Sequence, residues 1–147
     1  MRRLNEGGDD GNAIVEFVVL AVLLMLPLTY VMVAVFRLQA ASYGVAAASR
    51  DAGRAFVAAD TSGEAHERAA IAAAIVLADQ QVALDPSRLE ISCTAVPCLT
   101  PGALVTVRLS SPVDLPLLPA VLGGAAPSIT VAATHLEVID PYADLRP

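Results

Sequence analysis

The sequence predicts an α+β protein with a long amino-terminal transmembrane-plus-stalk helix, a second helix and a small three-stranded antiparallel sheet. Three observations support this fold class. An apolar run from Ala13 to Phe36 has Glu16 as its only ionisable residue, helical spacing of apolar residues continues beyond it, and short alternating segments follow Pro86. Because 56% of the 147 residues are hydrophobic and the mean hydropathy is +0.63, part of the chain is expected to lie in lipid.

The apolar run is long enough for a transmembrane helix. Its 24 residues would extend roughly 36 Å at about 1.5 Å per residue, whereas the hydrocarbon core of a bilayer is about 30 Å thick. A cleavable secretory signal is the alternative, since Arg2 and Arg3 provide a basic start, but its apolar core would have only about 7–15 residues. We therefore expect a cytoplasmic leader over 1–11 and a retained transmembrane helix over 12–36.

The cysteines bear on the orientation, because arginines stand on both sides of the apolar run and the positive-inside rule does not decide it. Cys93 and Cys98 are close in the sequence, in a segment that a disulfide can close in an oxidising compartment. Free core thiols and a zinc site remain alternatives, although zinc would need two further ligands and only His66 and His135 are available. A disulfide would place the carboxy-terminal domain outside the cytoplasm.

A stalk is expected to continue the first helix over 37–60, with Arg37 as an anchor at the membrane interface. Gly44 and Gly53 each weaken a helix by about 1 kcal/mol relative to alanine, and we interpret them as sites of close helix contact. The buried stripe of the stalk is predicted from three- and four-residue steps and comprises Leu38, Ala41, Val45, Ala48, Ala52 and Phe56.

The remaining residues, 61–147, are expected to form an extracytoplasmic α+β domain. A second helix should begin with Ser62 as its cap, carry Glu64 and Glu67 in its first turn, and end before Pro86. Its apolar face toward the stalk is predicted to comprise Ala70, Ala73, Ala74, Leu77 and Val82.

Three alternating segments, 89–93, 104–109 and 129–138, are predicted to be antiparallel strands. In the second of them Val105, Val107 and Leu109 share one face, which should pack against a helix. The proline-rich segment 112–127 is expected to be a loop, and 140–147 a frayed tail.

The most informative motif lies at the start of the apolar run. Gly11 borders the polar segment, Asn12 follows it, and Glu16 and Phe17 stand five and six residues after the glycine. In one interpretation Glu16 only extends to the membrane interface from about one turn inside the apolar segment. However, this spacing resembles the prepilin-peptidase motif of type IV pilins. That resemblance implies cleavage after Gly11 and a mature chain that begins at Asn12.

In outline the chain is similar to TadE-like minor pilins of Flp/Tad pilus systems over nearly its whole length, including an Ala/Arg-rich helix at 46–55. It departs from them in the position of Pro27 and in lacking an acidic residue beside Phe36. The resemblance implies that Glu16 and Phe17 serve subunit assembly. It also implies prepilin peptidase, other pilin or pseudopilin subunits, the Tad assembly machinery and membrane lipid as partners.

Other function classes find little support in the sequence. It has no Gly-rich phosphate loop, no His-containing metal motif and no Gly-x-Ser-x-Gly elbow, so we expect no enzyme, catalytic residue, metal or cofactor. A net charge of −6 and the absence of lysine disfavour nucleic-acid binding. We therefore expect a minor pilin or pseudopilin in the cytoplasmic membrane. The alternatives are an uncleaved single-pass adaptor with an outer binding domain and a minor pseudopilin of a secretion system.

Overall fold

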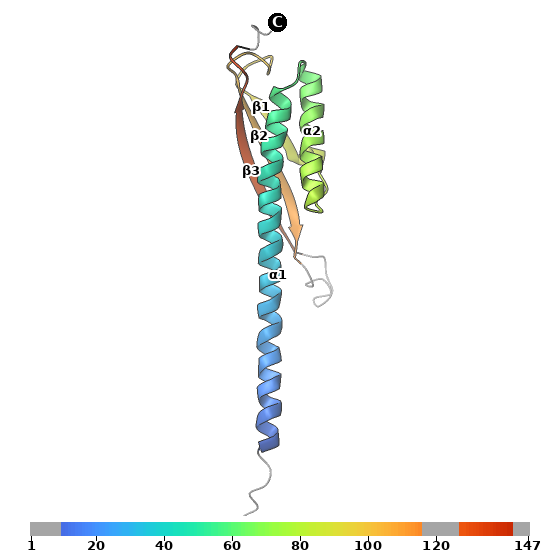
Figure 1. Cartoon of the computed structure of the whole chain (residues 1–147), viewed down its shortest axis with the longest axis vertical. Coiled ribbons are helices and arrows are strands. Elements are labelled where there is room, and N and C mark those ends of the chain that lie inside the picture. The colour runs from blue at the N-terminus through green and yellow to red at the C-terminus, as the bar shows by residue number, and fades with distance from the viewer. Residues whose placement is uncertain (1–9, 116–126, 143–147) are drawn as a thin grey trace, which may run out of the picture. The chain divides into compact units, whose positions relative to one another are not determined.

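A computed structural model describes residues 10–115 and 127–142, with side chains from residue 13 onward. The expected leader up to residue 9, the central part of the expected 112–127 loop and the tail from residue 143 lie outside the described residues. The α+β layout is confirmed (Figure 1). Its elements are α1 (Asp10–Val57), α2 (Ser62–Asp79), a 3₁₀ turn η1 (Pro86–Arg88), β1 (Leu89–Cys93), β2 (Leu104–Asp114) and β3 (Ser128–Val138).

The first of two compact units, residues 1–35, contains the amino-terminal part of α1. Its most apolar window has a mean hydropathy of 2.7, and none of that window is buried by protein. Pro27 lies within the helix without ending it, as transmembrane helices tolerate. Among the described residues this is one helix long and apolar enough to cross a membrane, and it fits a transmembrane segment.

The second unit, residues 36–147, has its core between two helices and a sheet. The carboxy-terminal part of α1 and α2 cover one face of the sheet (Figure 1). The predicted stalk stripe is confirmed for five residues, each at most 5% exposed: Ala41, Val45, Ala48, Ala52 and Phe56. The helix ends at Val57, earlier than the expected residue 60.

Helix α2 buries a different face from the one predicted. Ala73 and Leu77 are buried as expected, but Ala70 and Ala74 are only partly buried, and Ala65 and Ala69 take their place. The burial therefore recurs every four residues along α2. The predicted cap is also wrong by one residue, because Oγ1 of Thr61 accepts the first-turn hydrogen bond and Ser62 already belongs to the helix.

The sheet has the order β1-β2-β3, with both pairs antiparallel. Val105, Val107 and Leu109 are fully buried in the core, which confirms the predicted inner face of β2. Strand β2 continues to Asp114, so Pro112 lies in a strand and the prediction of a loop there is wrong. Beyond Leu109, where pairing with β1 ends, β2 pairs only with β3 in the described chain, and proline is tolerated on such an edge.

Both helix glycines allow close contact, Gly44 with the C-cap of α2 and Gly53 with the sheet. A Cβ atom on Gly53 would lie 2.9 Å from Cγ of Glu137 and 3.2 Å from Cδ2 of His135, both on β3. A Cβ atom on Gly44 would lie 2.8 Å from Cγ of Gln80, the residue that follows α2. The expectation of close helix contact is therefore corrected for Gly53, which lets α1 approach the sheet, whereas at Gly44 α1 approaches the end of α2.

Candidate functional site

The residues of the motif lie in the first turns of α1. The backbones of Gly11 and Asn12 are helical, and Glu16 and Phe17 follow one turn later with exposed side chains. Because Asn12 and Glu16 are four residues apart in a helix, they share one helix face and are separated by about 6 Å along its axis.

Glu16 is a lone carboxylate on an apolar surface. Within the described part of the chain it forms no ion pair or side-chain hydrogen bond, and Phe17 beside it is 72% exposed. Its exposed neighbours on α1 include Val15, Val19 and Leu20. In lipid an unpaired carboxylate is costly and usually has a partner, so this arrangement favours a contact with another molecule.

The predicted disulfide between Cys93 and Cys98 is present. Its sulfur atoms are 2.09 Å apart and its Cα atoms 5.3 Å apart. Two hydrogen bonds between Thr94 and Leu104 close the segment that follows, one from each backbone N–H. The disulfide links the end of β1 to the turn before β2. It excludes the alternatives in which these two cysteines are free thiols or bind zinc.

The two histidines lie apart. Nε2 of His135 is 2.9 Å from Oε1 of Glu137, in a half-buried pair on β3 next to Gly53. Nδ1 of His66 lies 2.8 Å from the carbonyl oxygen of Ser62, and its ring meets Phe56 edge-on at 5.1 Å. Among the described residues no three His, Cys, Asp or Glu side chains gather as metal ligands.

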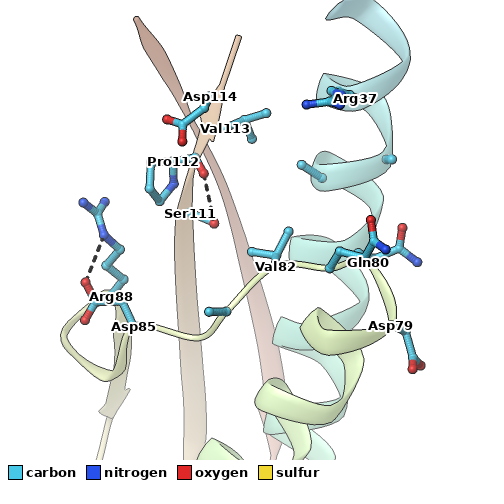
Figure 2. Close-up of a pocket in the computed structure, with 14 residues that line it drawn as sticks. Arg37, Asp79, Gln80, Val82, Asp85, Arg88, Ser111, Pro112, Val113 and Asp114 are labelled. Carbon is cyan, nitrogen blue, oxygen red and sulfur yellow. Dashed lines mark hydrogen bonds and ion pairs between the residues drawn. The ribbon is translucent and has the colours of Figure 1, made fainter. Parts of the chain in front are cut away.

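A cleft in the second unit was not anticipated from the sequence. It has a volume of about 790 Å³ and is lined by α1, the end of α2, the segment that follows α2, and β2 (Figure 2). Among the charged residues of the cleft, only Arg37 was given a role from the sequence, and that role was to anchor the helix at the membrane interface. Asp79, Asp85 and Arg88 lie within ten residues of one another, whereas Asp114 comes from a distant strand, and no spacing signal in the sequence could have grouped it with them.

One side of the cleft carries a local ion pair. Nε of Arg88 is 3.3 Å from Oδ2 of Asp85, and Oδ1 of Asp85 accepts hydrogen bonds from the hydroxyl and the backbone N–H of Ser87 at 2.7 and 3.0 Å. These hydrogen bonds from Ser87, more than the charge of Arg88, hold the pKa of the Asp85 carboxyl below its ordinary value. The negative charge of Asp85 and the positive charge of Arg88 therefore offset each other on this side of the cleft.

Comparisons of this chain with models of protein families, with curated proteins and with solved structures found no match.

Proposed function

We propose that this chain is a TadE-like minor pilin or pseudopilin of a Tad-type pilus, processed by prepilin peptidase between Gly11 and Asn12 and acting in pilus assembly or initiation. One observation carries the proposal. A glycine precedes a glutamate by five residues at the start of an apolar run in α1, and the most apolar window of that helix has no protein cover among the described residues.

The chemistry of that arrangement explains how it would serve assembly. Cleavage after Gly11 creates an ammonium group on Asn12 close to the membrane surface. Glu16 of one subunit then pairs with the ammonium group of its neighbour, because both groups lie near the same end of an apolar helix. In a bundle with little water, losing either partner leaves an uncompensated charge, so the pair sets the axial register of adjacent helices.

The disulfide supports the proposed location. Cysteine pairs of this kind persist in oxidising compartments and are rare in the cytosol. We therefore place the second unit on the extracytoplasmic side of the cytoplasmic membrane, with the amino terminus inside. The proposed partners are prepilin peptidase, other pilin subunits, the Tad assembly machinery and lipid.

The processing step is tested by intact mass spectrometry of the membrane-bound chain from cells that contain a prepilin peptidase. The variants are Gly11→Ala and, as a matched control, Gly8→Ala in the same polar segment. The wild-type chain and the control should both begin at Asn12, and the Gly11→Ala chain should keep its first residues. A full-length chain in all three samples would overturn the proposal and favour an uncleaved single-pass adaptor.

The assembly step needs a separate variant, because cleavage alone does not show incorporation. Glu16→Gln removes the charge while keeping the side chain's size and its hydrogen-bonding capacity. The processed variant should still begin at Asn12, but its amount in sheared pilus fractions should fall. Normal incorporation would contradict the role of Glu16, and recovery of the wild-type chain only with secretion components would favour a secretion pseudopilin.

A further inference from the structure

Strand β3 leaves one edge of the sheet without a neighbouring strand. The sheet order is β1-β2-β3, so among the described residues β3 is paired on one side only, and Figure 1 shows it at the margin of the sheet. Its pairing with β2 runs without a bulge from Leu104 opposite Val138 to Asp114 opposite Ser128. This free edge of β3 is therefore regular over the whole strand, which has 11 residues.

The register shows which backbone groups of β3 point to the free edge. At one end of the ladder the N–H of Ile139 donates to the carbonyl oxygen of Ala103 at 2.9 Å. At the other end the N–H of Leu115 donates to the carbonyl oxygen of Pro127 at 3.1 Å. Because hydrogen-bonded and non-hydrogen-bonded pairs alternate in antiparallel strands, odd-numbered β3 residues bond to β2 and even-numbered ones direct N–H and C=O to the free edge. The even-numbered residues, all exposed, are Ser128, Thr130, Ala132, Thr134, Leu136 and Val138.

This edge lacks the features that commonly keep edge strands from pairing. Natural proteins blunt such edges with lysine, proline or a bulge. Strand β3 contains none of the three, and its even-numbered side chains, which share the outer face of the sheet, are uncharged. Its titratable side chains, His135 and Glu137, lie on the inner face and are joined to each other by a 2.9 Å contact. The free edge can therefore accept another strand.

One end of the free edge is also apolar. Leu104 lies opposite Val138, and Thr106 lies opposite Leu136, so these side chains neighbour one another on the outer face. The side chains of Leu104, Leu136 and Val138 are all exposed. A strand added beside β3 would cover Leu136 and Val138 with its own outer-face side chains. The hydrogen-bonding groups and the apolar side chains at this end thus favour the same kind of occupant.

A single extended segment fits this edge better than a second copy of the chain. Helix α1 packs closely over β3, because a Cβ atom on Gly53 would lie within 3.2 Å of side-chain atoms of both His135 and Glu137. Paired strands lie about 4.8 Å apart, whereas the axes of packed helices lie about 8–10 Å apart. A second copy joined through its own β3 would bring its α1 into the same space, and a single segment brings no helix.

We propose that the free edge of β3 binds an extended segment of a partner protein by strand addition. The backbone of that segment bonds to the even-numbered residues of β3, and its side chains are uncharged and apolar at the alternate positions that cover Leu136 and Val138. This interaction goes beyond the proposed pilin function and requires neither cleavage after Gly11 nor a particular location of the chain.

The test measures amide hydrogen exchange of the full chain in detergent micelles by NMR, with a synthetic peptide as the probe. The peptide alternates threonine and valine between two terminal lysines, which keep it soluble. At ~1 mM peptide, exchange of the even-numbered β3 amides should slow about tenfold, which corresponds to a dissociation constant of about 0.1 mM. The amides of Val131 and Ala133 already bond to β2, so their exchange should change much less.

Two variants at one position separate backbone pairing from side-chain contact. The N–H of Thr134 points to the free edge, so Thr134→Pro breaks no hydrogen bond to β2 but removes a donor from that edge. It should abolish the protection, whereas Thr134→Ala keeps the donor and should retain the protection. Slow exchange of the buried Val107 amide checks that both variants are folded. As a control that needs no variant, a peptide with proline in place of every threonine should protect no amide.

Unchanged exchange of the even-numbered amides in the wild-type chain, or equal slowing at Val131 and Ala133, would overturn the proposal. Protection that survives Thr134→Pro, or that the proline peptide also produces, would do the same. Protection that rises with the concentration of the chain itself, without peptide, would assign the edge to a second copy and overturn the partner segment. An uncleaved chain would refute the proposed function alone, because cleavage does not enter this measurement.

Discussion

Two glycines of α1 should respond in opposite directions to the same substitution. We expect Gly53→Ala to destabilise the second unit and Gly44→Ala to stabilise it. Both changes favour the helix by about 0.8–1.0 kcal/mol, because alanine has the higher helix propensity. The difference between them therefore comes from what the added methyl group meets.

At Gly53 the methyl group meets a constrained part of the sheet. It would lie 2.9 Å from Cγ of Glu137 and 3.2 Å from Cδ2 of His135, whose side chains are joined by a 2.9 Å contact and are only about one quarter exposed. Overpacking costs about 1–3 kcal/mol, and loss of the hydrogen bond costs about 1 kcal/mol. After subtraction of the helix term, the net destabilisation is about 1–3 kcal/mol.

At Gly44 the methyl group meets Cγ of Gln80 at 2.8 Å, but Gln80 is exposed and its flexible side chain can rotate away. Most of the helix term should therefore remain, and the variant should be about 0.5–1 kcal/mol more stable. In a domain of this size each kcal/mol moves the unfolding midpoint by about 4–8 °C.

The assay should report on the second unit alone, because the apolar part of α1 can stay helical in detergent after that unit has unfolded. Hydrogen exchange of the buried β2 amides, such as those of Val105 and Val107, meets this requirement. Exchange should be faster than wild type in Gly53→Ala and slower in Gly44→Ala. Equal or slower exchange in Gly53→Ala would refute the close approach of α1 to β3.

Three further changes test local structure. Thr61→Ala removes the N-cap of α2 and should cost about 1 kcal/mol in thermal unfolding, whereas alanine at the serine that follows should cost clearly less. Replacing Cys93 and Cys98 by serine should lower the free energy of unfolding, measured in denaturant, by about 2 kcal/mol, because the disulfide closes a loop with a sequence separation of 5 and so reduces the entropy of the unfolded chain. An unchanged denaturation midpoint would contradict a stabilising role of the disulfide. Ser87→Ala should raise the pKa of Asp85 toward its ordinary value of 3.8, as an NMR titration would measure, because the hydroxyl hydrogen bond is lost. Since the folded-state pKa is lowered, the stability that this carboxylate contributes is present above pH 3.8 and is lost as the pH falls through the folded-state pKa.

The elements that could be predicted from the sequence have strong contrast between apolar and polar positions. The alternation of apolar and polar residues predicted both ends of β1 correctly. It also identified the inner face of β2, which consists of Val105, Val107 and Leu109. The stalk stripe up to Phe56 followed from the three- and four-residue steps between its members.

The errors occur where that contrast is missing. Alanines occupy both the buried and the partly buried sides of α2, so apolar periodicity does not distinguish Ala69 from Ala70. Thr61 and Ser62 are both good capping residues, and only the backbone geometry shows which one caps. From the sequence, Pro112 indicates a loop. It is compatible with a strand only because the edge of β2 beyond Leu109 is not paired with β1.

The candidate sites also differ in how far they could be predicted from the sequence. The Gly11–Glu16 spacing is local, so the sequence shows it fully, and its role in processing and assembly stays a prediction. The cleft is lined both by residues of α1, such as Arg37, and by residues of β2, such as Asp114, which lie far apart in the chain, and no local pattern indicates this.

The order of α1 and β2 along the chain has a consequence for biosynthesis. The stripe that ends at Phe56 is made early, whereas its partner Val107 is made about 50 residues later, which takes several seconds at about 5–20 residues per second. During that interval the stripe has no sheet to cover it. Three of its five buried residues are alanine, and a small side chain exposes less apolar area than leucine would. The alanine-rich composition therefore reduces wrong association of the nascent chain before β2 and β3 arrive.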